Sequence, residues 1–272
     1  MCGSAAGLSS RRQYPRAGSA LKETRHLYSD LAWLWPLWGR AEDEYAHYCR
    51  FVVRQIRDHA QRPVRTVLDI GCGGGKNVFN LKKKFQVTGL DLSPVMLAQA
   101  RRRNPECEFI WGDMRMFRLE RSFDAILMDD AISLMNTRAD FAAAFRAAFV
   151  HLNPGGVLIA TPDATVETFR QNATVCATSS GNTPKGPVAV TFIENHYDPA
   201  PADDHFEATL IYLIHRKGRL RMASDHWRLG LFPLGFWRHV VADTGFTVRS
   251  APYCDDDENE YTVLIGCKSR NA

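Results

Sequence analysis

The chain has no long apolar run. No stretch of about 18 consecutive apolar residues occurs among its 272 residues, so no transmembrane helix is expected. The N-terminus also lacks the apolar segment of a secretory signal. The seven cysteines are scattered and form no Cys-x-x-Cys pair, which predicts reduced thiols and neither a disulfide framework nor a zinc site. These absences predict a cytoplasmic protein that does not bind membranes or metal.

Acidic residues are missing from residues 1–22, which hold four of the 34 basic residues and none of the 30 acidic ones. The rest of the chain is therefore balanced in charge, which argues against a broad nucleic-acid surface. Residues 1–20 are rich in Ser, Gly, Ala and Arg and predict a disordered tail, with an organellar transit peptide as the alternative. The acidic run at 255–260 lacks the spacing of a calcium loop and is interpreted as a solvated loop.

The pattern of expected helices and strands divides residues 21–272 into four parts. Residues 21–62 are aromatic and helical, with breaks at Pro36 and Gly39, and predict an N-terminal helical cap. Residues 63–162 alternate strands and helices, which predicts a doubly wound, mostly parallel α/β sheet. Residues 163–232 contain long strands and predict an antiparallel insertion. It would serve as a substrate lid or as the interface of a homodimer, because free strand edges favour pairing. Residues 233–272 return to the core as a helix and two strands.

A glycine loop stands at the centre of this pattern. The apolar run at 64–70 stops at Asp69-x-Gly71-x-Gly73-x-Gly75, and a helical pattern follows at once. A strand, a tight turn and a helix start are expected, with glycines that let a ligand approach the backbone closely. The spacing differs from the G-x-G-x-x-G of dinucleotide-binding folds, which makes NAD the weaker alternative as cofactor.

Further signals follow the next strands. Asp91-Leu92 ends the second strand, where a carboxylate can accept hydrogen bonds from both hydroxyls of a ribose. Asp113-Met114 follows the third strand, and Asp129-Asp130 follows the fourth. A Pro-Gly-Gly turn at 154–156 precedes the fifth. Ligands bind beyond the carboxyl ends of such strands, so these residues are expected to meet.

Together these motifs, over residues 63–162, resemble the class I S-adenosylmethionine (SAM)-dependent methyltransferases. The resemblance implies a seven-stranded sheet with six parallel strands and one reversed. It also implies SAM as cofactor, with Asp113 and Met114 at the adenine and cap tyrosines at the methionine end. The cofactor-binding set that it implies is Asp69, Gly71, Cys72, Gly73, Asp91, Leu92, Asp113, Met114, Asp129, Tyr28 and Tyr45.

Candidate catalytic residues follow from the chemistry of methyl transfer. Methyl transfer to an amine needs only a neutral nucleophile, whereas a hydroxyl needs a base. Asp129 and Asp130 are candidates at the edge of the transfer site. His196 and His226 in the insertion are candidates as well, although a histidine in a strand is more often structural.

The acceptor predicted is a small molecule, with transfer to nitrogen preferred over oxygen. The insertion resembles that of N-methyltransferases acting on aminosugars of antibiotics, and of related natural-product enzymes. Those aminosugar enzymes carry a histidine after the fourth strand, whereas this chain reads Asp130-Ala131-Ile132-Ser133-Leu134-Met135 there. The Asn/Asp-Pro-Pro-aromatic motif of nucleic-acid amine methyltransferases is also missing. A methyltransferase acting on RNA or protein, and a non-catalytic SAM-binding protein, remain as alternatives.

Overall fold

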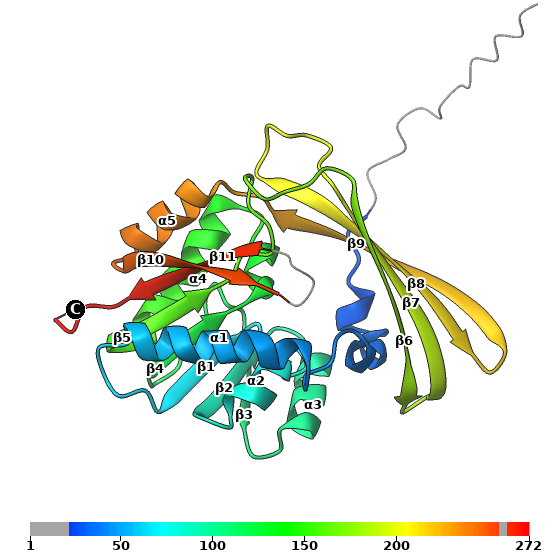
Figure 1. The fold of residues 1–272 in the computed structure, drawn as a ribbon, viewed down its shortest axis with the longest axis horizontal. Coiled ribbons are helices and arrows are strands. Elements are labelled where there is room, and N and C mark those ends of the chain that lie inside the picture. Colours follow the sequence, from blue (N-terminus) through cyan, green and yellow to red (C-terminus); the bar gives the residue numbers. More distant parts are fainter. Residues whose placement is uncertain (1–21, 256–259, 272) are drawn as a thin grey trace, which may run out of the picture.

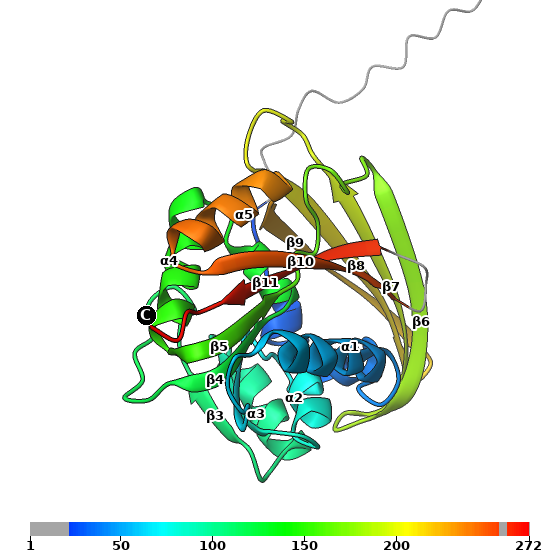
Figure 2. The same ribbon diagram turned by 60° about the vertical axis from the view of Figure 1, so that its left-hand side comes forward.

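The computed structural model describes residues 22–255 and 260–271. Its main body is a seven-stranded sheet in the order β10-β11-β5-β4-β1-β2-β3 (Figures 1 and 2). Only β11 runs against its neighbours, so six strands are parallel and one is reversed, as the sequence predicted. The strands are β1 (Thr66–Ile70), β2 (Gln86–Asp91), β3 (Glu108–Trp111), β4 (Phe123–Met128), β5 (Leu152–Ala160), β10 (Thr247–Cys254) and β11 (Glu260–Cys267).

Helices cover both faces of this sheet. One face packs against α1 (Glu44–His59), α2 (Lys76–Leu81) and α3 (Pro94–Arg103) through a cluster that includes Ile56, Leu81 and Leu97. The other face packs against α4 (Arg138–Val150) and α5 (Leu234–Asp243), where Phe141 meets Trp237 edge to face. The β4 and β5 strands are buried on both faces, which is typical of a doubly wound parallel sheet. The predicted α/β fold is therefore confirmed.

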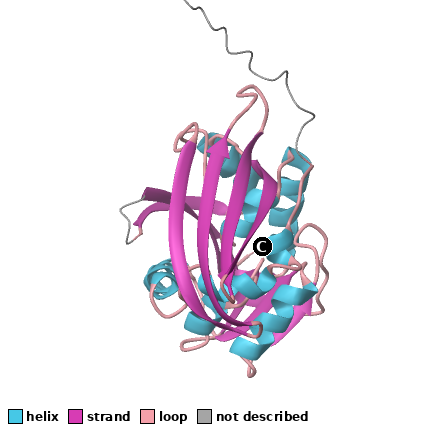
Figure 3. Ribbon diagram, turned by 90° about the vertical axis from the view of Figure 1, so that its right-hand side faces the viewer, coloured by secondary structure: helices cyan, strands magenta, loops and turns pink. Residues whose placement is uncertain are grey.

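A second sheet of four antiparallel strands stands beside the first. It consists of β6 (Ala173–Thr183), β7 (Gly186–Tyr197), β8 (His205–Arg216) and β9 (Arg219–Gly230), in that order. Its inner face faces the large sheet, and its outer face is turned to the viewer in Figure 3. The sequence does not predict a strand at β6, because its residues are mostly small and polar and do not alternate.

The segment between residues 22 and 43 joins the two sheets (Figure 1). It forms two 3-10 helices, η1 (His26–Tyr28) and η2 (Ala32–Leu37), in place of the longer helix expected. Pro36 lies inside η2 and cannot donate a backbone hydrogen bond, so an α-helix does not propagate there. Leu27, Leu31 and Leu34 pack on the inner face of the small sheet.

Two other local predictions change. The Asn153–Gly156 turn lies within β5, as an irregularity in its pairing with β4. A short 3-10 helix that was not predicted, η3 (Asp130–Leu134), follows β4. None of the helices in the described part of the chain is both long and apolar enough to cross a membrane.

Candidate functional site

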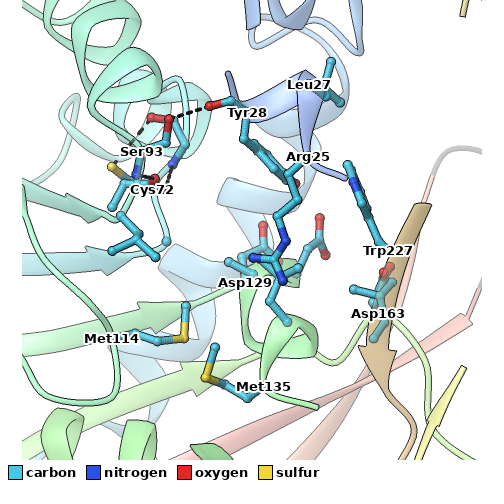
Figure 4. Close-up of a pocket in the computed structure, with 18 of the residues that line it drawn as sticks. Arg25, Leu27, Tyr28, Cys72, Ser93, Met114, Asp129, Met135, Asp163 and Trp227 are labelled. Atoms are coloured by element: carbon cyan, nitrogen blue, oxygen red, sulfur yellow. Dashed lines mark hydrogen bonds between the residues drawn. The ribbon is translucent and has the colours of Figure 1, made fainter. Parts of the chain in front are cut away.

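A cavity of about 780 Å³ opens where the carboxyl ends of β1 to β4 meet the cap and the small sheet. Because neighbouring parallel strands end at the same edge, residues distant in sequence are gathered there. Figure 4 shows Cys72, Ser93 and Met114 on one side of the cavity and Asp163 and Trp227 on the other. Of the predicted residues, the lining contains Tyr28, Tyr45, Gly71, Cys72, Gly73, Asp91, Leu92, Asp113, Met114, Asp129 and Asp130.

The glycine loop is held against β2. The amides of Gly71 and Cys72 both donate to the carbonyl of Leu90, at 2.7 and 3.0 Å. Gly71 has φ of +77°, and a Cβ there would lie 2.3 Å from the Cβ of Ala131. A side chain at this position would therefore be strained and would also collide with the segment after β4. The loop thus keeps bare backbone at the cavity wall.

Asp91 lies at the end of β2, beside this loop. Its carboxylate accepts hydrogen bonds from the amides of Gly73, at 2.8 Å, and Ser93, at 2.7 Å. Burial raises the pKa of Asp91, and the two amide donors oppose that rise. Ser93 also caps α3, since its hydroxyl accepts from the amide of Met96. The carboxylate is therefore fixed in place by backbone on two sides.

Asp113 takes a different partner. The guanidinium of Arg115 bonds both of its oxygens, and these hydrogen bonds hold the pKa of Asp113 below its usual value. Arg115 also bonds Asp140 of α4 at 3.2 Å. This pairing fixes the loop after β3 to α4. Met114 lies next to it, with its side chain at the cavity (Figure 4).

Aromatic side chains of the cap close the cavity from above. Tyr28 stacks on Trp227 of β9, with ring centroids 5.1 Å apart. Trp35 lies against the glycine loop so closely that a Cβ on Gly74 would be 2.6 Å from its ring. The ammonium of Lys76 donates to the carbonyl of Trp38 and lies 4.9 Å from the ring centroid of Tyr45. The cap thus covers the glycine loop with aromatic rings.

Carboxylates form another wall of the cavity. Asp129 accepts a hydrogen bond from the side-chain amide of Asn77 at 2.8 Å, and Asp130 begins η3 next to it. Burial raises the pKa of Asp129 against the hydrogen bond from Asn77. Burial, followed by repulsion from Asp129 and Asp163, raises the pKa of Asp130 well above its usual value. Such shifts occur where like charges gather in a cleft.

Asp163 and Glu194 complete this wall, from the segment after β5 and from β7. Burial, followed by repulsion from Glu194, raises the pKa of Asp163 to about 6. Glu194 bonds the Nε2 atom of His196 at 2.9 Å. Burial lowers the pKa of His196, whereas the hydrogen bond and the negative charge of Glu194 raise it. The pKa of His196 is therefore raised overall. His196 therefore lies behind Glu194 and outside the cavity lining.

Two predicted residues lie elsewhere. His226 is on the outer face of the small sheet, since side chains alternate along β9 and Trp227 takes the inner face. Its imidazole lies 3.3 Å from the hydroxyl of Thr209 and 3.7 Å from Glu207, so the prediction of a catalytic His226 is not supported. Asp69 is buried beneath the loop and is not part of the lining. Burial, followed by repulsion from Asp129 and Asp91, raises its pKa well above the usual value.

Sequence reasoning missed several lining residues. Asp163 could have been found, because it follows the end of β5 as Asp129 follows the end of β4. Glu194 had no such signal, since its position depends on how the small sheet docks. For Trp35, Trp38 and Trp227, the sequence does not predict whether the side chain faces the cavity or the core. Within the described residues, no group of three or more His, Cys, Asp or Glu side chains is arranged to hold a metal ion.

Comparison with known proteins agrees with this geometry. Residues 67–156 match a family model described as a methyltransferase domain. The dTDP-3-amino-3,4,6-trideoxy-alpha-D-glucopyranose N,N-dimethyltransferase of Streptomyces venezuelae is 32% identical over 194 residues, which are 65% of this chain and 80% of that protein. The chain belongs to the SAM-dependent methyltransferases.

Other relatives refine the comparison. The dTDP-3-amino-3,6-dideoxy-alpha-D-glucopyranose N,N-dimethyltransferase of Streptomyces fradiae is 30% identical over 85% of this chain and 88% of that protein. The sugar N-methyltransferase KedS8 of a Streptoalloteichus species is 26% identical, with a TM-score of 0.70 over 98% of this chain and 99% of that structure. DesVI of S. venezuelae, at 23% identity, has the same fold, with a TM-score of 0.74 over 91% of this chain and 100% of that structure.

The residues present fit the cofactor of this family. The glycine loop forms a cradle that a Cβ at Gly71 would fill, and the carboxylate of Asp91 lies beside it at the end of the neighbouring strand. The enzyme is thus a SAM-dependent methyltransferase, and its glycine loop and Asp91 both line the cavity.

Proposed function

We propose that the enzyme methylates an amino group of a small molecule of the aminosugar class. The observation that carries this proposal is the group of four carboxylates that line the cavity, Asp129, Asp130, Asp163 and Glu194. Carboxylates attract an ammonium group and accept its hydrogen bonds. The relatives named for N,N-dimethylation of aminosugars support the same reaction.

Cofactor residues are proposed from their places in the cavity. Gly71, Cys72 and Gly73 would lie against the amino-acid end of SAM, and Asp129 would accept from its ammonium. Asp91, with Leu92 beside it, would accept from the ribose hydroxyls.

At the adenine end, Asp113 would accept from the amino group and the amide of Met114 would donate to the ring. Asp113 already accepts four hydrogen bonds from the backbone amide and the guanidinium of Arg115, so the adenine amino group would share the carboxylate oxygens with Arg115. Bound SAM supplies an electrophilic methyl group on a positively charged sulfur.

The division of the chain follows from this assignment. Residues 63–162 and 233–272 would hold the cofactor. The cap at 21–62, with Tyr28 and Tyr45, and the insertion at 163–232 would enclose the acceptor. The enzyme's main tasks would be to position the amine and to exclude water, because the cofactor already carries the reactivity.

Proton movement is the remaining task. An acceptor ammonium must lose one proton before its nitrogen can form the new bond to carbon, and the methylated nitrogen must lose another before a second transfer. We propose that the carboxylate oxygens of Asp163 or Glu194 accept this proton. His196 is a positioning residue in this scheme, because it holds Glu194 by the bond at 2.9 Å and does not line the cavity. Asp130 would orient the same ammonium.

The test is direct. The enzyme is incubated with methyl-labelled SAM and a 3-amino-3,6-dideoxyhexose glycoside, and the product is examined by NMR. We expect the labelled methyl group on nitrogen, with one and then two groups added. Transfer to a sugar hydroxyl would contradict the proposal, and so would exclusive transfer to RNA or to a protein side chain.

The location of the enzyme is a further part of the proposal. The six described cysteines are free thiols, which agrees with a cytoplasmic location.

The outer face of the small sheet carries Met222 and Leu220, which are 65% and 54% exposed. We propose a homodimer as the use of this apolar face, testable by light scattering of the enzyme and of a Met222→Lys variant.

A further inference from the structure

The cavity is unusually acidic for a site that would take a nucleotide-linked acceptor. Eight carboxylates and three cationic side chains line it. All three cations are already engaged by the protein. Arg115 bonds Asp113 and Asp140, and Arg25 bonds Glu23 at 2.5 Å. Lys76 donates to the carbonyl of Trp38 and lies over the rings of Trp35 and Tyr45.

Four of the carboxylates have no such compensation. In the part of the chain that the structure describes, no lysine or arginine forms an ion pair with Asp129, Asp130, Asp163 or Glu194. Asp129 is bonded by the neutral amide of Asn77, and Glu194 by His196. They come from the end of β4, the start of η3, the end of β5 and the middle of β7, so the tertiary fold alone brings them to one wall.

This charge distribution discriminates between acceptors. The relatives from S. venezuelae and S. fradiae are named for dTDP-linked aminosugars, which carry an ammonium and a diphosphate. A diphosphate in this cavity would add negative charge beside Asp130, Asp163 and Glu194, which have no lysine or arginine partner, and would find every cation of the lining already bonded. A cationic acceptor would instead be attracted, and most strongly at low ionic strength.

We infer that the acceptor is a cationic amine that carries no diphosphate: an amino group on a free or glycosidically attached sugar, and not on a nucleotide sugar. The amine lies against Asp130, Asp163 and Glu194. This inference rests on the proposed transfer to nitrogen. It separates this enzyme from its dTDP-dependent relatives and implies that a glycosyl transfer or hydrolysis removes the nucleotide before methylation.

Two acceptors that differ only in the nucleotide provide the test. The kcat/KM values are measured for dTDP-3-amino-3,6-dideoxyglucose and for the methyl glycoside of the same aminosugar. In parallel, the binding of dTDP and of the methyl glycoside to the enzyme with S-adenosylhomocysteine is measured by calorimetry. We expect the methyl glycoside to be preferred at least tenfold, its kcat/KM to fall as salt is added, and dTDP to show no binding.

Neutral variants locate the effect. Asp163→Asn and Glu194→Gln should each weaken binding of the methyl glycoside about tenfold and should increase the relative use of the dTDP-linked sugar. Glu207→Gln is the matched control, because it removes the same charge from the outer face of the same sheet. It should leave both acceptors unchanged. If a variant does not fold, the fall of kcat/KM for the methyl glycoside with added salt, measured on the unmodified enzyme, still tests whether negative charge attracts the acceptor.

The outcomes are distinct. A preference for the dTDP-linked sugar, or saturable dTDP binding that the methyl glycoside displaces, would overturn the inference. If the methyl glycoside binds in a carboxylate-dependent way but is not methylated, the selectivity of the cavity for a cationic amine without a diphosphate stands and the proposed methylation of that amine fails. If it neither binds nor reacts although S-adenosylhomocysteine binds, both are overturned.

Discussion

The two halves of the cavity treat their carboxylates in opposite ways. On the side of the large sheet, Asp91 is bonded by two backbone amides and Asp113 by an arginine. In the half formed by η3, the segment after β5 and strand β7, Asp130 and Asp163 repel each other, and burial raises the pKa of both. In the first half, backbone amides and an arginine offset the negative charge, whereas in the second half no lysine or arginine pairs with either carboxylate within the described residues. Sites that bind charge commonly carry such imbalance.

The largest expected effect tests the first half. Gly71→Val should reduce the affinity for S-adenosylhomocysteine at least 100-fold, because the residue has positive φ and its Cβ would lie 2.3 Å from that of Ala131. Calorimetry measures the affinity. Gly235→Ala is the control, since nothing lies within 4 Å of a Cβ there, and it should bind normally. Retained affinity in Gly71→Val would mean that the cofactor lies elsewhere.

Asp91→Ala should weaken SAM binding by about 1–3 kcal/mol, the cost of losing charge-assisted hydrogen bonds to the ribose. The same titration measures it. Glu108→Ala removes a carboxylate from the neighbouring strand β3, where it pairs with Arg121 away from the cavity, and should leave the affinity unchanged. Equal affinities for the two variants would remove the ribose assignment.

Asp163→Asn should stabilise the protein at pH 8 by about 1–3 kcal/mol. The pKa of Asp163 is raised to about 6 in the folded state, against an ordinary value near 3.8. Its charge therefore opposes folding above pH 6, and the penalty disappears as the pH falls below 4. Urea titrations at pH 8 and pH 4 measure the difference. A variant less stable than the parent at pH 8 would contradict the raised pKa.

Asp113→Asn should show the reverse sign and a smaller size. Arg115 lowers the pKa of Asp113 in the folded state, so the pair stabilises folding above the ordinary pKa and is lost as the pH falls through the lowered one. Because Arg115 is 40% exposed, solvent screening limits the loss to about 0.5–1 kcal/mol. Stabilisation at pH 8 in both aspartate variants would mean that the two halves do not differ.

Two histidine variants complete the series, and the smallest effect is expected at His226. His226→Gln should change kcat/KM less than twofold, because the imidazole lies on the outer face of the small sheet. His196→Gln should lower kcat/KM for an amine acceptor about tenfold and shift its pH profile, since the bond that holds Glu194 is altered. A large effect of His226→Gln would restore it as a catalytic candidate.

The same contrast explains what the sequence could predict. The glycine loop, Asp91 and Asp113 are recognisable because each depends on residues next to it and on the regular alternation of strands and helices. Glu194 and Asp163 are 31 positions apart in the sequence. They meet only because the small sheet packs beside the large one, and no local sequence pattern predicts that packing. The face on which His226 lies could not be predicted, because the alternation of β9 could be assigned to a face only once the packing of Trp227 was known. The β6 strand was missed because its exposed, small residues show no period of two.

The cap has a mechanical consequence. Asp225 of β9 is buried and accepts from the amides of His26 and Leu27, at 2.6 and 2.8 Å. A few residues later, the carbonyl of Tyr28 accepts from the hydroxyl of Ser93, the neighbour of Asp91. One turn of chain therefore connects the two sheets and is fixed at one end beside Asp91. Tyr28, which also stacks on Trp227 of β9, is thus held by both sheets at the wall of the cavity.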